Sequence, residues 1–435
     1  MKSMILFVYF IFINLTLNIK KSFQSYIIYP FKRSSKQIKL FPENLLQNDL
    51  EITIEIGTPP QNIDLNIRFQ TYTFFITSLK TNLSFPVFNE SNSTSLVMTS
   101  NRISSVGGQE FINCYRINES IIINHQEIKN ISLVLATSLT YNESGVIGFR
   151  LVKSHDFGGA LSFLYQIKKK INLDNYAFTL RYNNNDEGEL ILGTYPHLYD
   201  KNYKKKKFLY TKVGNIGVKI DWVLDFDFIK YDNQVINGII TKSLIKVEFG
   251  LIQAPLELKK YFNDNFFFNK CKEKFYSGKN ITIIHCDKNF DIKSFKNLSF
   301  ILKDIEYEFI LTYKELFIEK DDEYIFSIVF DNKTINPDPF WILGELFIKK
   351  YQLVYDLDKK IIGLYSEIEN ENENEKGNDN NNKSDKRINI YLSIIFILLW
   401  IIISLIIFIF LFFNKQKRNK ALELNDDTLD YIATN

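Results

Sequence analysis

The sequence predicts an all-β protein of two similar halves, followed by one apolar helix. Between residues 50 and 365, short apolar stretches such as LEITIEIG, ELILGT and FILKDIEYEFIL alternate with polar turns, which is the pattern of strands. Only two segments, Gly159 to Ile171 and Leu256 to Phe266, have a helical pattern. The motifs GVIGF at 145–149 and WILGE at 341–345 both place a glycine after apolar residues, near the ends of the two halves. They suggest an internal duplication.

The composition is that of a globular protein whose positive and negative charges are nearly balanced. The 435 residues are 46% hydrophobic, 15% aromatic and 24% charged, and 53 basic side chains against 50 acidic ones leave a net charge of +3. This balance excludes wholesale disorder and nucleic-acid binding driven by overall charge. The 4 histidines are scattered without the spacing of metal ligands, so we expect neither a metal site nor a cofactor.

Both ends of the chain carry apolar segments that predict a membrane-anchored secretory protein. Residues 1–21 have a basic start and a short apolar run, which is typical of a signal peptide. Residues 390–413 contain no charge and are long enough to span a membrane once, and a basic cluster follows them. The positive-inside rule then makes residues 414–435 a cytoplasmic tail. We therefore expect a single-pass type I protein whose body is extracellular or in a secretory or vacuolar lumen.

The remaining boundaries follow from shifts in composition. Residues 22–47 form a short basic segment in the position of a pro-segment, and residues 48–200 and 201–366 form an N-terminal and a C-terminal β lobe. Residues 367–389, rich in Asn and Glu, are expected to be a disordered stalk before the membrane helix. Frequent Asn-x-Ser/Thr motifs agree with a glycoprotein, although many arise by chance in an Asn-rich chain.

The three cysteines permit one disulfide and one remaining thiol. Cys271 and Cys286 are 15 residues apart, so a bridge between them would close a modest loop. In an oxidising lumen such a bridge would contribute about 3 kcal/mol. Cys114 is then outside the disulfide, and we expect it to be a buried, unreactive thiol.

Motifs in order along the chain point to one family. IGTPPQ at 56–61 follows an alternating strand, and WILGELFIKKY at 341–351 precedes VYD and IG. Between them lie the strand pair of residues 176–193, the segment that starts at Trp222, and Cys286. Together they resemble the pepsin-like aspartic proteases, peptidase family A1, over roughly residues 48–366.

This resemblance implies a bilobal pepsin-like fold with a peptide-binding cleft between two β lobes. It also implies that Cys286 belongs to the disulfide of the second lobe. Glu345 stands where the family usually has aspartate.

The resemblance also implies that each lobe carries an Asp-Thr-Gly loop, because two carboxylates that share one proton activate a water molecule. Counting on from Gln61 places Arg68 at the first aspartate, and counting back from Pro255 places Lys246 at the second. Arginine stays protonated at physiological pH, and one lysine cannot replace a pair of carboxylates. We therefore expect no intact catalytic residue, and a pseudoprotease is the expected result.

Other parts of the expected cleft are altered as well. The cleft loops hold Phe69 and Gln70 in one lobe and Val247 and Glu248 in the other. Phe69 and Val247 occupy the places of two threonines that join the loops by hydrogen bonds in the family, so we expect packing to replace that network. The expected flap hairpin at 103–109 lacks its tyrosine. Gly148 and Gly344 match the lobe glycines of the family.

Arg68 and Lys246 admit two interpretations. They are either solvent-facing residues in a cleft that no longer matters, which we favour, or a cationic floor for a carboxylate or phosphate group. Asp64 and Glu248 are carboxylates close in sequence to Arg68 and Lys246. We do not expect them to replace the two catalytic aspartates, because the mechanism requires a strict geometry.

Three functions therefore remain open. The first is a catalytically silent homologue whose cleft binds a peptide or protein. The second is an active aspartic endopeptidase of the secretory or vacuolar route. The third is a structural or adhesive surface glycoprotein. We favour the first, with a monomeric ectodomain and no nucleic-acid partner. Fold alone does not decide between them.

Overall fold

The computed structural model describes most of the body of the chain: residues 26–34, 43–81, 86–106, 109–138, 143–151, 162–184, 186–216, 219–236, 241–267, 270–276, 280–331 and 340–367. All of these described residues belong to one compact unit. The predicted signal peptide, stalk, membrane helix and tail lie outside the described residues, apart from residue 367. No helix within the described ranges is long and apolar enough to cross a membrane.

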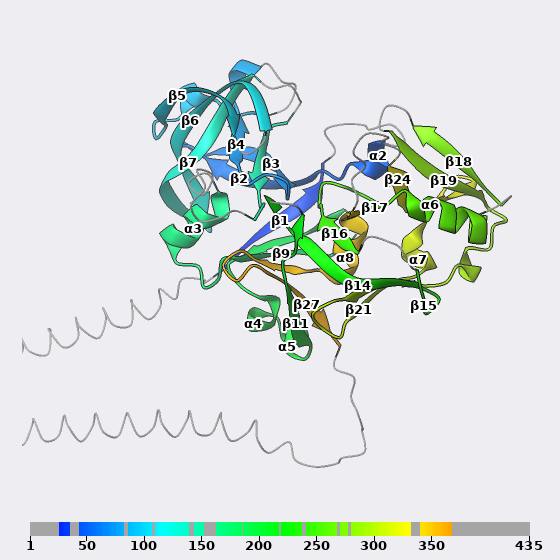
Figure 1. Cartoon of the computed structure of the whole chain (residues 1–435). Coiled ribbons are helices and arrows are strands. Elements are labelled where there is room, and N and C mark those ends of the chain that lie inside the picture. Colours follow the sequence, from blue (N-terminus) through cyan, green and yellow to red (C-terminus); the bar gives the residue numbers. More distant parts are fainter. Residues whose placement is uncertain are drawn as a thin grey trace, which may run out of the picture. The chain divides into compact units, whose positions relative to one another are not determined.

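Most of the described residues lie in two β-sheets, as the sequence predicts (Figure 1). The first sheet has 13 strands, in the order β11 (Lys207–Lys212), β27 (Ile361–Ser366), β26 (Val354–Asp356), β9 (Ala177–Tyr182), β10 (Glu187–Leu192), β1 (Ile27–Arg33), β2 (Leu50–Ile56), β3 (Gln61–Arg68), β8 (Gly145–Gly148), β4 (Phe74–Thr77), β7 (Gln126–Ser138), β6 (Gln109–Ile123) and β5 (Val97–Val106).

The second sheet has 12 strands. Its main path is β21 (Glu308–Leu311), β20 (Leu298–Leu302), β14 (Val223–Tyr231), β16 (Lys242–Ile245), β25 (Trp341–Leu343), β17 (Ile252–Ala254), β24 (Ile328–Asp331), β19 (Ile281–Asp287), β23 (Glu323–Phe326) and β22 (Phe317–Lys320). Off this path, β15 (Gln234–Val235) pairs with β14 and β18 (Cys271–Tyr276) pairs with β19. The short strands β12 (Asn215–Ile216) and β13 (Lys219–Ile220) pair with each other.

The two sheets contain the same arrangement of four strands. In the first, β8 runs parallel to β3 and antiparallel to β4, and β4 runs parallel to β7. In the second, β25 runs parallel to β16 and antiparallel to β17, and β17 runs parallel to β24. The GVIG and WIL motifs occupy β8 and β25, the equivalent central strands. The internal repeat read from the sequence therefore corresponds to a repeated strand arrangement.

Strands from both ends of the unit meet in the first sheet. β1 pairs with β10 and β2, and β26 pairs with β9 and β27. β11, which lies beyond residue 200, pairs with β27 in the same sheet. The predicted boundary between two lobes at 200/201 stays a prediction, but sheet membership does not change at that residue.

The helices are short and lie between the strands. They are α2 (Glu43–Leu46), α3 (Phe163–Ile171), α4 (Pro196–Tyr199), α5 (Lys201–Lys204), α6 (Glu257–Phe262), α7 (Tyr313–Leu316) and α8 (Glu345–Tyr351), and a π-helical turn at Asn263–Phe267 continues α6. The two helical segments predicted from the sequence correspond to α3 and to α6 with its π-helical turn.

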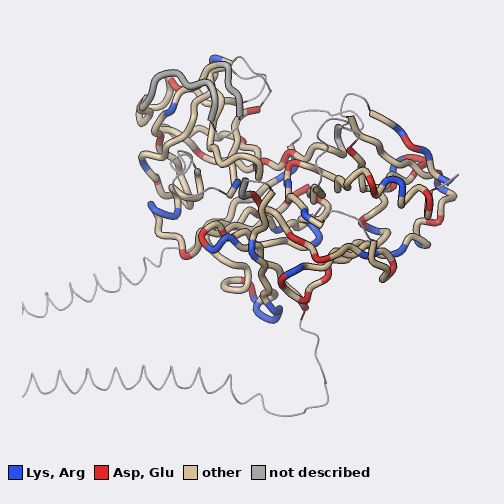
Figure 2. Tube along the Cα trace, viewed as in Figure 1, with Lys and Arg blue, Asp and Glu red and all other residues tan. Residues whose placement is uncertain are grey.

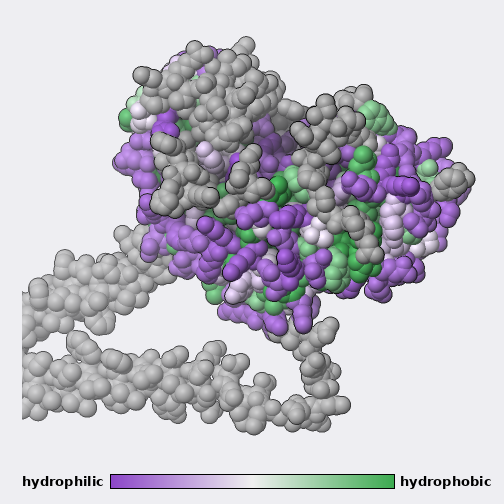
Figure 3. All heavy atoms as spheres, in the orientation of Figure 1, coloured by the Kyte–Doolittle hydropathy of each residue, from purple (hydrophilic) through white to green (hydrophobic). Residues whose placement is uncertain are grey.

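A continuous apolar core joins the two sheets. Trp222 and Trp341 are fully buried, and aromatic rings fill much of the space around them. The disulfide between Cys271 and Cys286 forms as predicted and links β18 to β19, while Cys114 is buried in a small cluster with Phe75. Acidic and basic residues are interspersed along the described chain rather than separated by sign (Figure 2). The face shown in Figure 3 is largely hydrophilic, with apolar groups between the charged ones.

Candidate functional site

Two loops at equivalent positions of the repeated strand arrangement form the candidate site. The first follows β3 and leads into β4, and it begins with Phe69 and Gln70. The second follows β16 and leads into β17, and it contains Lys246, Val247 and Glu248. The structure thus places all the predicted loop residues at the ends of equivalent strands, with Arg68 as the last residue of β3.

Gly148 and Gly344 permit the close approach of a neighbouring strand end to each loop. A Cβ atom at Gly148 would lie 2.3 Å from the Thr71 carbonyl oxygen in the first loop. A Cβ atom at Gly344 would lie 2.2 Å from the Phe249 carbonyl oxygen in the second. Contacts this short are forbidden, so only glycine fits at both positions. The residues after the glycines then fasten the loops: the N–H groups of Arg150 and Glu345 donate to those same two carbonyl oxygens, at 2.9 and 2.6 Å.

Arg68 is enclosed by carboxylates rather than facing solvent. Its side chain is 15% exposed, and one guanidinium nitrogen lies 2.8 Å from Asp49 and 2.6 Å from Glu143. Burial alone would lower the pKa of Arg68, but Glu143, Asp49 and Glu248 outweigh it and raise the pKa. The Arg68 side chain therefore stays protonated, and its charge is compensated by Asp49 and Glu143. Our favoured expectation that Arg68 faces solvent was wrong.

Glu248 makes the direct link between the two loops. Its Oε2 accepts a hydrogen bond from the Phe69 N–H at 3.2 Å. Its Oε1 is buried without a hydrogen-bond partner in the described part of the chain, and so is Nε2 of Gln70. Burial raises the pKa of Glu248, although Arg68, backbone N–H groups and Lys246 oppose the shift. The sequence suggested that packing alone replaces the threonine network, yet a carboxylate also connects the loops.

Packing does contribute under the first loop. Phe69 is fully buried, and its ring lies edge-on to Phe178 at 5.3 Å and to Tyr355 at 5.0 Å between centroids. Trp222 contacts the same two rings, and its indole N–H donates to the Phe149 carbonyl oxygen at 2.7 Å. Such edge-on pairs add about 0.5–1.5 kcal/mol each beyond burial. Val247 of the second loop is also fully buried.

The N-terminal segment holds the second loop, a role the sequence did not indicate. Asn48 donates from Nδ2 to the Val247 carbonyl oxygen at 2.9 Å and from its backbone N–H to the Glu248 carbonyl oxygen at 3.1 Å. Arg33 donates to Asn48 Oδ1 at 3.0 Å and binds both oxygens of Glu345 at 2.7 and 2.8 Å. These partners are far apart in the sequence, so no local pattern could have revealed them.

The expected flap forms as a hairpin, with Val106 of β5 paired with Gln109 of β6. Tyr115 lies farther along β6, opposite Arg102 and Leu135. Asp64 lies within β3, where it accepts a hydrogen bond from Thr53 at 2.7 Å. It is therefore part of the sheet rather than of either loop. Among the described residues, no cluster of His, Cys, Asp and Glu suits a metal ion.

Comparison with known families agrees with this strand and loop pattern. The model of a family described as eukaryotic aspartyl protease matches residues 51–366, which is more than half of the chain. The chain belongs to this family of pepsin-like proteases. No curated protein matches the chain. For an aspartyl protease, the loops after β3 and β16 are where the catalytic aspartates are expected, and that assignment of Arg68 and Lys246 stays a prediction from the sequence register.

Proposed function

We propose that this aspartyl protease family member is catalytically silent and uses its interlobe cleft to bind a peptide or a protein segment. The observation that carries the proposal is the environment of Arg68, the last residue of β3, which binds Asp49 and Glu143. The sequence register predicts that this residue stands at the position of the first catalytic aspartate. The aspartic mechanism needs two adjacent carboxylates that share a proton. Here Asp49 and Glu143, two carboxylates at that position, both bind an arginine instead.

The contacts within and between the two loops support the proposal that the cleft still binds a peptide. They keep their glycine supports, their aromatic packing and a direct link through Glu248. A buried polar atom without a partner costs about 1–3 kcal/mol, and both loops contain one, on Gln70 and Glu248. A peptide backbone offers a donor and an acceptor at each residue, so a bound peptide would offset part of this cost after a small side-chain movement.

An active endopeptidase is the second candidate, and one observation favours it. Glu248 is a carboxyl group with a raised pKa at the point where the two loops meet. A carboxyl group that retains its proton is suited to act as a general acid. Asp49 and Glu143 both bind Arg68, so neither is free to activate water beside Glu248. For this reason we rank the silent homologue first.

The proposal includes the cellular setting predicted from the two apolar ends of the chain. A cleaved signal peptide at 1–21 and a membrane helix at 390–413 would display the body on the non-cytosolic side. The ligand would then be a peptide or protein of the cell surface, or of a secretory or vacuolar lumen. We propose a monomeric ectodomain.

The decisive experiment is a peptidase assay of the folded protein with a mixed peptide library between pH 3 and pH 7. It compares the wild type with Glu248→Gln, and each is measured with and without a statine-type inhibitor. We expect no cleavage above that of a heat-unfolded sample. Cleavage that the inhibitor and Glu248→Gln both abolish would establish the active alternative through Glu248.

Hydrogen–deuterium exchange tests binding separately from cleavage. A statine-type peptide should slow exchange in peptides that cover residues 69–73 and 246–250 if the cleft binds peptide. A folded protein with neither cleavage nor protection would refute the peptide-binding proposal and favour the structural or adhesive alternative.

A further inference from the structure

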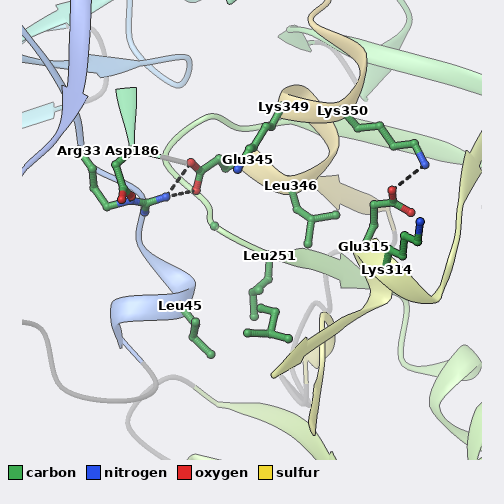
Figure 4. A pocket seen from close by; sticks show the side chains of 12 residues that line it. Arg33, Leu45, Asp186, Leu251, Lys314, Glu315, Glu345, Leu346, Lys349 and Lys350 are labelled. Atoms are coloured by element: carbon green, nitrogen blue, oxygen red, sulfur yellow. Dashed lines mark hydrogen bonds and ion pairs between the residues drawn. The ribbon is translucent and has the colours of Figure 1, made fainter. Parts of the chain in front are cut away.

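A cavity lies at the end of the second loop, and neither Phe69 nor Glu248, the residues that join the two loops, lines it. It has a volume of about 720 Å³ and is lined from α2, the end of the second loop, α7, β22 and α8 (Figure 4). Arg33 and Asp186 close one side of it. A volume of this size suits a small-molecule ligand.

The two polar sides of the cavity differ in charge. On one side, Arg33 is fully engaged by Glu345 and by Asp186, the latter at 2.9 Å. On the other, Lys350 pairs with Glu315 at 3.0 Å, and Lys314 projects beside this pair with no ion-pair partner among the described residues. The side formed by α7 and α8 therefore has more cations than carboxylates.

Apolar side chains occupy the middle of the cavity. Figure 4 shows Leu346 between the two ion pairs and Leu251 and Leu45 below it, and Ile318 adds a fourth aliphatic group. Leu251 is almost fully buried, whereas Leu346 is partly exposed. A ligand that covered Leu346 and its neighbours would gain about 25 cal/mol for each Å² of apolar surface removed from water.

We propose that this cavity binds a small amphiphilic carboxylate, with its apolar body on the leucines and its carboxylate beside Lys314. A single anionic head would compensate the charge of Lys314, which has no ion-pair partner in the described part of the chain. A polyanion such as a nucleotide would meet the three lining carboxylates, Asp186, Glu315 and Glu345, and a cation would be repelled by Lys314.

The cavity is in direct contact with the candidate site. Gly250 and Leu251, the last two residues of the second loop, line it, and the Glu345 N–H donates to the Phe249 carbonyl oxygen of that loop at 2.6 Å. A ligand here would contact the end of the second loop without contacting Phe69 or Glu248. The inference therefore does not depend on whether the cleft is active, silent or empty.

The test uses the full chain in lipid nanodiscs, with 4-phenylbutyrate as the probe and 4-phenylbutan-1-ol as its neutral counterpart. Binding is measured by saturation-transfer NMR and located by hydrogen–deuterium exchange. We expect saturable binding of the acid, with slower exchange at residues 313–318 and 345–351. Lys314→Glu should weaken binding about tenfold or more, which corresponds to about 1.4 kcal/mol.

Lys293→Glu is the matched control, because Lys293 is an exposed lysine of another turn and does not line the cavity. It should leave the affinity unchanged. The proposal is overturned if the acid does not bind saturably, if protection falls outside α7 and α8, if Lys314→Glu binds as tightly as the wild type, or if the neutral alcohol binds equally well.

Discussion

Replacing Arg33 by alanine should destabilise the protein by leaving the Glu345 carboxylate without its partner. Glu345 is 8% exposed at its side chain, Arg33 is 34% exposed, and two hydrogen bonds join them. Breaking a buried ion pair costs about 3–5 kcal/mol, whereas an exposed pair contributes about 0–1 kcal/mol. The partial exposure of Arg33 screens the interaction, so we expect a loss of about 2–3 kcal/mol from Arg33→Ala.

Urea unfolding measures this loss, and two further variants separate its cause from general damage to β1. Lys32→Ala changes the exposed neighbour of Arg33 and should cost less than about 0.5 kcal/mol. Arg33→Ala combined with Glu345→Gln removes the uncompensated charge and should recover about half of the loss. The reasoning is refuted if Arg33→Ala costs no more than Lys32→Ala, or if Glu345→Gln gives no recovery.

Three further predictions concern the loops and the disulfide. Gly344→Ala should lower the free energy of unfolding in urea by about 3 kcal/mol or more, because the added methyl group would meet two carbonyl oxygens. Gly363→Ala should lower it less, because there the methyl group meets a side-chain ring that can move. Burial raises the pKa of Glu248, so its contribution to stability is present at low pH and is lost as pH rises through the folded-state value. The stability of Glu248→Gln relative to wild type should therefore increase from pH 4 to pH 7, and a pH-independent difference would contradict this. Reducing Cys271–Cys286, which closes a loop with a sequence separation of 15, should lower stability by about 3 kcal/mol, and an unchanged melting temperature under reductant would argue against it.

Local patterns in the sequence accounted for much of the fold. Alternating apolar residues marked strands such as β2 and β10, and the repeated glycine motif marked β8 and β25, because these patterns depend on near neighbours. The disulfide agrees with the modest loop between Cys271 and Cys286 and with the place that the family resemblance implies for Cys286. The π-helical turn after α6 was included in the predicted helix, since the apolar pattern does not distinguish the two.

The surroundings of the candidate site were less predictable. Position counting identified Arg68, but its partners Asp49 and Glu143 come from separate segments of the chain. The same holds for Asn48, whose contacts with the second loop cross about 200 residues of sequence. Such pairings depend on how the strands are arranged in space and leave no trace in a single sequence.

The pairing of β26 with β9 has a consequence for the order in which the chain folds. β9 ends at Tyr182, and its outer neighbour begins at Val354, so the edge of β9 stays open until nearly the whole body has been synthesised. An open strand edge can pair with another chain, and pairings between distant segments form slowly. The first half should therefore depend on chaperones or on rapid synthesis until the last two strands arrive. Truncation before residue 354 should yield aggregation rather than a smaller soluble protein.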